Sequence, residues 1–141
     1  IYQATAAFAR PPRCVLHSHS THCVALTLAP HGGELLAPIT PYFVMKVGHV
    51  PHIPYHRPGD VQAAALVAQT VTDYGQQGRP IRAVMLSRLG PNVWHDSPAA
   101  AMATLEELEE TARLVCLAPS PIPSLTEEQI QELRATFAAR W

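Results

Sequence analysis

The chain lacks the features that mark secreted, disulfide-stabilised or membrane-spanning proteins. Its cysteines, Cys14, Cys23 and Cys116, are odd in number and show no C-x-x-C spacing, which argues against a disulfide framework and against a cysteine-based zinc motif. No apolar run approaches the roughly 20 residues that a helix needs to cross a bilayer. The sequence shows no signal-peptide pattern either. These absences predict a reducing, cytoplasmic location.

Charge is also scarce. Charged residues make up 15% of the 141 residues, the formal net charge is −1, and Lys and Arg are scattered singly. Binding to nucleic acid or to an anionic membrane surface requires a basic patch, so we expect neither partner. The length suits a single domain over residues 1–141. The apolar share of 48% favours burial of surface against further copies of the chain, as in a homo-oligomer.

Two histidines one residue apart are the strongest chemical signal. His17 and His19 follow the apolar run Cys14-Val15-Leu16, which is typical of the end of a buried strand. Alternate residues of a strand share a face, so both imidazoles can bind one divalent metal ion. The chain has 8 histidines, and a chance pair without a metal remains an alternative.

Hydrophobic periodicity and breaker residues divide the chain into alternating helices and strands. We expect the end of a helix over 2–9, a strand over 14–17, a helix over 21–29, extended segments over 38–48 and 50–55, a helix over 60–75, strands over 81–86 and 92–95 joined by a turn at Gly90-Pro91, and helices over 97–116 and 126–141.

Typical helix-starting residues mark three of these boundaries. Asp60 is a favoured N-cap, Ser97 with Pro98 is a typical helix start, and Thr126 with Gln129 has the spacing of a capping box. Helices on both sides of a strand-rich middle predict a layered α/β domain.

The other histidines and the acidic cluster carry no predicted chemistry. Pro51 prevents a helix through His49, His52 and His56, so we interpret these histidines as surface or hydrogen-bonded residues. The glutamates within 106–110 fall on the outer face of an amphipathic helix, where a solvated surface is the expected role.

Three sequence segments together resemble the class II aldolase/adducin family. They are VLHSHSTH at residues 15–22, PYHRPGD at 54–60 and LEELEETA at 105–112, and the likeness covers nearly the whole chain. The segment ITPYFVMKVG at 39–48 is most similar to the branch of decarboxylases that act on phosphorylated 3-oxo sugar acids.

This resemblance implies a three-layer α/β fold with a central, mostly antiparallel sheet flanked by helices. It implies a homotetramer and a zinc or other divalent ion held by His17 and His19. The implied activity is that of a metal-dependent lyase, which cleaves a C–C bond of a phosphorylated sugar acid or sugar phosphate through a metal-stabilised enediolate. Tyr42 matches the region where related aldolases supply a proton donor from the neighbouring subunit, and packing in an interface is an equally good interpretation.

The chain departs from the family pattern at two places. Leu89 stands where the third histidine ligand is expected, and Arg88 adds a permanent cation beside it. His22 or His95 could supply the missing donor. The resemblance also implies that the catalytic glutamate and most of the phosphate-binding loop lie upstream of residue 1, so that this chain is the C-terminal two-thirds of the family domain. A non-catalytic, adducin-like oligomerisation or interaction remnant, or a truncated fragment, is therefore the alternative function.

Overall fold

The computed structural model describes residues 1–6, 8, 10–29 and 33–141. In chain order the elements are β1 (Cys14–His17), α1 (Thr21–Leu26), the π-helix η1 (Phe43–Val47), β2 (His52–Ile53), α2 (Val61–Gln76), β3 (Ala83–Leu86), β4 (Gly90–His95), α3 (Pro98–Leu117) and α4 (Glu127–Phe137). In the described part of the chain, no helix combines the length and apolar character needed to span a membrane.

The strands of the described residues form one sheet in the order β1-β4-β3-β2. The β1–β4 and β4–β3 pairs are antiparallel, and the short edge strand β2 runs parallel to β3. This confirms the mostly antiparallel sheet. Because β1, β2 and β3 all run in one direction, their carboxyl ends lie at the same edge, which we call the carboxyl edge.

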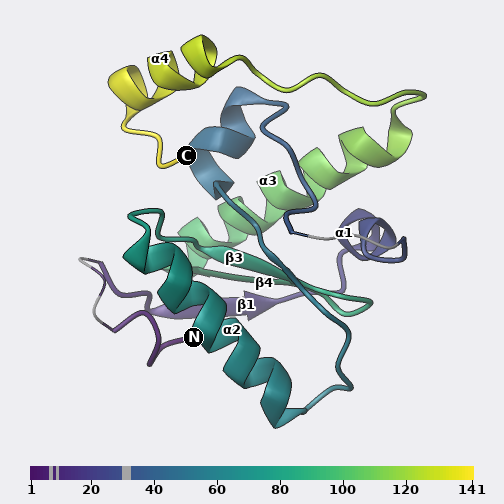
Figure 1. Ribbon diagram of the computed structural model, residues 1–141, viewed down its shortest axis with the longest axis vertical. Coiled ribbons are helices and arrows are strands. Elements are labelled where there is room, and N and C mark those ends of the chain that lie inside the picture. Colours follow the sequence, from purple (N-terminus) through teal and green to yellow (C-terminus); the bar gives the residue numbers. More distant parts are fainter. Residues whose placement is uncertain (7, 9, 30–32) are drawn as a thin grey trace.

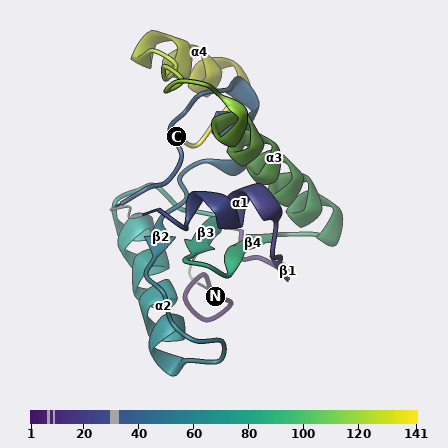
Figure 2. The same cartoon turned by 90° about the vertical axis from the view of Figure 1, so that its right-hand side faces the viewer.

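Helices cover both faces of the sheet, so the domain has three layers. Figures 1 and 2 both place α2 on one side of the sheet and α1, η1 and α3 on the other. Alternate strand residues point to opposite faces. Met85 and Val93 accordingly join the hydrophobic core beneath α3, whereas Val84 and Trp94 join a second core beneath α2. The predicted layered α/β domain is thus confirmed.

The predicted helix starts are confirmed by their hydrogen bonds. The Asp60 carboxylate accepts from the Gln62 backbone N–H at 2.9 Å, and the Ser97 hydroxyl accepts from the Ala100 N–H at 3.2 Å. Thr126 and Gln129 form the reciprocal bonds of a capping box, as expected.

The segment over 38–48 was predicted to be extended, but its residues 41–47 are helical and include η1. Its prolines misled the prediction, because Pro41 lies in the first turn, where a missing N–H breaks no helical bond. The Thr40 hydroxyl accepts from the Phe43 N–H at 3.1 Å, and Phe43 and Val44 are buried. Burial of this apolar face against α3 therefore decides the conformation.

Four further segments differ from the prediction. Residues 2–6 form turns rather than the end of a helix, and residues 7 and 9 of that predicted segment lie outside the described part. Gly90 and Pro91 begin β4 instead of forming the turn, which lies over residues 87–89. The helices predicted over 21–29 and 126–141 end earlier, at Leu26 and Phe137.

Candidate functional site

The two predicted metal ligands lie at the carboxyl edge of the sheet. His17 is the last residue of β1, His19 follows in the connection to α1, and both are exposed. Their ring centroids are 5.1 Å apart with an interplanar angle of 77°. The structure therefore brings the two imidazoles together, in a place open to a ligand.

The start of β4 packs directly against this pair. His17 Nδ1 lies 3.1 Å from the Pro91 carbonyl oxygen, which also accepts from the Ser18 N–H at 3.2 Å. Because a carbonyl only accepts, Nδ1 carries the proton and the Nε2 lone pair of His17 is left to bind a ligand. Metal-binding histidines are commonly oriented through such a bond from the second ring nitrogen.

Gly90, the first residue of β4, allows the close approach of this strand to the histidines. A Cβ at position 90 would lie 2.2 Å from the Ser18 carbonyl oxygen, and the φ of Gly90 is +103°. Both facts require glycine. Leu89, at the position where the resemblance predicts the third ligand, is the last residue of the turn that leads into this strand.

The donor set does not complete a catalytic zinc site. Such a site takes three protein ligands, whereas no three His, Cys, Asp or Glu residues come together among the described residues. His22 is held elsewhere, because its Nδ1 lies 2.7 Å from a Glu109 carboxylate oxygen. His95 pairs with Cys14 at the opposite end of β1 from His17. Neither predicted replacement reaches the pair.

Glu109 was predicted to be a solvated surface residue of the acidic cluster, but in the structure it binds the first turn of α1. Its carboxylate accepts from the backbone N–H groups of His22 and Cys23, at 3.0 and 3.1 Å. Burial raises the pKa of this carboxyl, but these N–H groups and the His22 ring outweigh burial and hold the pKa below its ordinary value. The side-chain spacing on α3 could not reveal this contact.

A small cavity of about 310 Å³ opens at the same edge, between the ends of β2 and β3. Its lining includes Ser87, Arg88, Tyr55 and Thr27. Arg88 has a φ of +63°, and its backbone N–H donates to the Thr27 hydroxyl at 2.8 Å. The exposed guanidinium of Arg88 suits an anionic group in this cavity. From the sequence alone, Arg88 was interpreted only as a cation that would repel a metal ion bound nearby.

Tyr42 lies immediately before η1, on the α3 side of the sheet, and is 59% exposed. Its described ring contact is with Lys46, whose ammonium lies 5.2 Å from the ring centroid. Its exposure leaves the ring accessible to a neighbouring subunit, so its role stays a prediction.

A protein-family model describing the class II aldolase and adducin N-terminal domain matches residues 1–116. A curated 3-oxo-tetronate 4-phosphate decarboxylase of Cupriavidus necator is 48% identical over 139 residues, covering 94% of this chain and 61% of the relative. The protein of the same name in Escherichia coli K12 is 40% identical over 129 residues, covering 88% of this chain and 58% of the relative. The chain therefore spans about three-fifths of the length of these relatives.

Solved structures agree on the fold. The crystal structure of YgbL from Escherichia coli is 39% identical and superposes with a TM-score of 0.69, covering 85% of this chain and 56% of the other. An L-fuculose 1-phosphate aldolase superposes with a TM-score of 0.71 at 17% identity, covering 95% and 59%. The second likeness concerns the fold alone.

Proposed function

Because this chain belongs to the class II aldolase and adducin family, we propose that it serves a carbon–carbon lyase that decarboxylates a phosphorylated 3-oxo sugar acid. The observation that carries the proposal is the convergence of His17 and His19 at the carboxyl edge, with Nδ1 of His17 bonded to the Pro91 carbonyl. The names and identities of the curated relatives support the substrate class.

We assign three roles to residues at this edge. His17 and His19 are the two protein donors for zinc or another divalent ion. The Pro91 carbonyl fixes the tautomer of His17. Arg88, in the neighbouring cavity, binds the carboxylate or phosphate of the substrate through its guanidinium. Two imidazoles alone make an incomplete zinc site, so the donor set limits this chain to weak metal binding.

A second function is favoured by one observation, which is Leu89 in the third-ligand turn. Leucine has no lone pair to donate, and the adjacent Arg88 cation disfavours a divalent ion. In this alternative the fold persists as a non-catalytic oligomerisation or interaction module, comparable to adducin. The family membership is common to both functions, which differ in metal binding.

Zinc calorimetry on the whole chain separates the two functions. We would titrate the wild type beside His17→Ala, with His56→Ala as a matched control that removes a histidine from another loop. Binding of about one zinc per chain that is lost only in His17→Ala supports the lyase, and release of CO₂ from a 3-oxo-tetronate 4-phosphate then becomes the assay. Equal zinc binding in all three proteins contradicts the assigned ligands. Absence of binding in the wild type favours the non-catalytic module.

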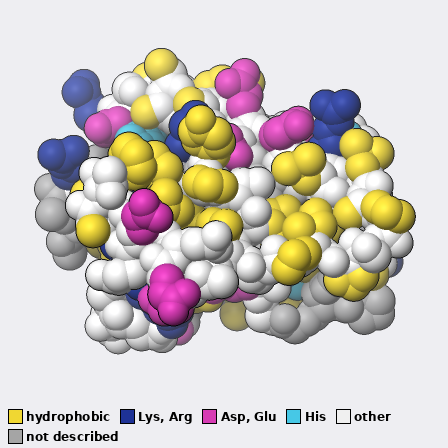
Figure 3. All heavy atoms as spheres, turned by 90° about the horizontal axis from the view of Figure 1, so that it is seen from above, with side chains coloured by type: hydrophobic (Ala, Val, Ile, Leu, Met, Phe, Trp, Pro, Cys, Tyr) yellow, Lys and Arg dark blue, Asp and Glu magenta, His cyan; other side chains and the backbone are white. Residues whose placement is uncertain are grey.

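We also propose that copies of the chain associate, as the resemblance implies. Leu114 and Leu117 on α3 and Phe137 on α4 are exposed, and Figure 3 shows apolar side chains gathered on the face that includes α4. Exposed apolar area of this kind is typical of interaction surfaces. Light scattering after size exclusion measures the mass directly, and a tetramer is the expected state.

A further inference from the structure

The edge of the sheet opposite the carboxyl edge holds a second cavity, which the proposed lyase chemistry does not use. Its volume is about 250 Å³, and Arg10, Arg82, Arg140, His95 and Asp96 provide its polar lining. His95 ends β4 and pairs with Cys14 at the start of β1, so the length of β1 separates this cavity from His17. We call it the arginine cavity.

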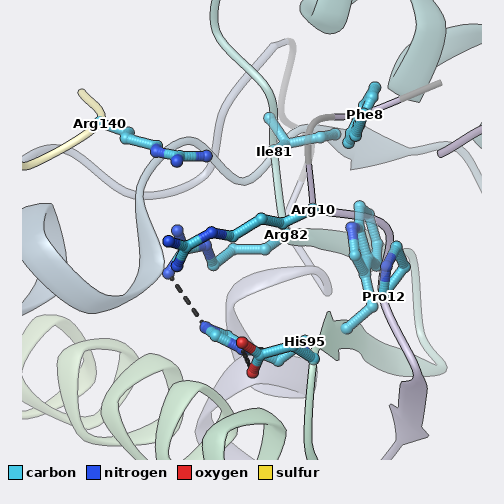
Figure 4. Close-up of a pocket in the computed structure, with 9 residues that line it drawn as sticks. Phe8, Arg10, Pro12, Ile81, Arg82, His95 and Arg140 are labelled. Carbon is cyan, nitrogen blue, oxygen red and sulfur yellow. Dashed lines mark hydrogen bonds and ion pairs between the residues drawn. The ribbon is translucent and has the colours of Figure 1, made fainter. Parts of the chain in front are cut away.

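We propose that the arginine cavity binds the phosphate group of a small phosphorylated metabolite or free phosphate. Three guanidinium groups come to it from different parts of the chain: the connection before β1, the residue before β3 and the segment after α4. Figure 4 shows Arg10 and Arg82 extending into the cavity and Arg140 turned toward the same space. Arginine matches phosphate geometry through its planar set of donors.

The charges in the cavity are unbalanced. His95 Nε2 faces Arg82 Nη1 at 3.3 Å, and because a guanidinium only donates, Arg82 is the donor of this contact. His95 Nδ1 contacts the Asp96 carboxylate at 2.5 Å. Asp96 is the sole carboxylate of the described lining, so three cations face one anion. The remaining charge of about +2 matches a phosphate monoester, which carries about −1.5 to −2 at neutral pH.

None of the three arginines forms an ion pair within 4.0 Å in the part of the chain that the structure describes. Arg82 is partly buried, and burial together with the nearby charge of Arg140 lowers its pKa, while Asp96 opposes the shift. Placing like charges near the partly buried Arg82 costs free energy. A bound anion would offset this cost, which supports anion binding by the three arginines.

The position of Arg140 is fixed by its neighbour. Trp141 stacks on His49 with ring centroids 4.3 Å apart, and the Trp141 carbonyl oxygen accepts from Arg134 Nη2 at 2.8 Å. The backbone that carries Arg140 is therefore held in place beside the cavity. The cavity volume of about 250 Å³ lies slightly below the usual range of ligand pockets, which suits a small anion.

Isothermal titration of the whole chain with inorganic phosphate, 3-phosphoglycerate and malonate tests the proposal. Arg10→Gln and Arg140→Gln change exposed side chains, and each should weaken binding of the phosphate compounds by about tenfold or more. Arg57→Gln, an equal charge change on an exposed loop residue, should leave it within about twofold. Tighter binding of 3-phosphoglycerate identifies a phosphorylated metabolite as the ligand, and equal binding identifies free phosphate.

Three results would overturn the proposal. The first is that neither phosphate compound releases or absorbs heat on titration. The second is that the cavity variants and Arg57→Gln lose phosphate affinity equally. The third is that malonate binds as tightly as phosphate. Arg88→Gln tests whether the anion binds at the carboxyl edge instead. If Arg88→Gln loses phosphate binding while Arg10→Gln and Arg140→Gln keep it, the anion binds at the carboxyl edge and not in the arginine cavity. The unfolding midpoint of each variant, measured in parallel, must match the wild type. The inference does not depend on the metal site, and His17→Ala should bind phosphate normally.

Discussion

Replacing Gly90 by alanine tests the close contact between the start of β4 and the connection after β1, which carries His19. The added Cβ would lie 2.2 Å from the Ser18 carbonyl oxygen and 3.3 Å from the His19 Cα. Both neighbours are backbone atoms, which cannot turn away as the end of a flexible side chain can. Either the start of β4 or the connection after β1 must move, and the histidines move with that connection.

The cost has two parts that a matched control separates. Gly59 also has a positive φ, +79°, but a Cβ added there would meet no atom within 4 Å, so Gly59→Ala measures the backbone strain alone, about 1 kcal/mol. Gly90→Ala adds an overpacking cost of about 1–3 kcal/mol. The sum, about 2–4 kcal/mol, is a large fraction of the 5–15 kcal/mol stability typical of a domain.

Urea unfolding of the two variants and the wild type measures these costs as differences in free energy of unfolding. We expect Gly90→Ala to be the less stable variant by at least about 1 kcal/mol, and its zinc affinity to fall because the imidazoles are displaced. Equal destabilisation by the two substitutions would refute the close contact. The packing of the start of β4 against His19 would then be wrong as well.

Three other outcomes follow from single contacts. Glu109→Gln should lower the free energy of unfolding near neutral pH, because the first turn of α1 holds the pKa of the Glu109 carboxyl below its ordinary value. The contribution of the carboxylate to stability is fully present above its pKa in the unfolded state, and it is lost as the pH falls through its pKa in the folded state. Urea titrations of both proteins at several pH values measure this loss. Burial and a 2.7 Å hydrogen bond to Glu34 raise the pKa of Tyr74 to about 12, and tyrosinate absorbance should show part of that rise disappearing in Glu34→Gln. Ser97→Ala should cost about 1 kcal/mol of unfolding free energy through loss of the α3 cap, and an unchanged urea midpoint would contradict that cap.

The sequence predicted those helices and strands whose conformation depends on residues close together in the chain. Asp60 and Ser97 cap α2 and α3 as expected because an N-cap bond involves residues only two or three positions apart. β1 was predictable because three apolar residues precede the histidines. The conformation of residues 38–48 was not, because it depends on burial of Phe43 against a helix more than fifty residues later in the chain.

The site shows the same division. The pair His17 and His19 could be predicted from spacing along one strand, since both donors come from nearby positions. The engagement of His22 by Glu109 could not, because the two residues are 87 positions apart. The arginine cavity could not be predicted for the same reason: its three cations are scattered singly in the sequence and only the fold brings them together.

The start of β4, directly after the turn that holds Leu89, positions the histidine pair through backbone contacts. Its backbone orients His17 through the Pro91 carbonyl and packs against Ser18 at Gly90, and neither contact depends on the side chain at position 89. The backbone needed by a third ligand is therefore retained although Leu89 cannot donate. Leu89→His should consequently raise zinc affinity without a loss of stability beyond about 1 kcal/mol, the usual scale of a single substitution. Calorimetry that finds unchanged zinc affinity in a stably folded Leu89→His protein would mean that the side chain at position 89 does not face the histidine pair.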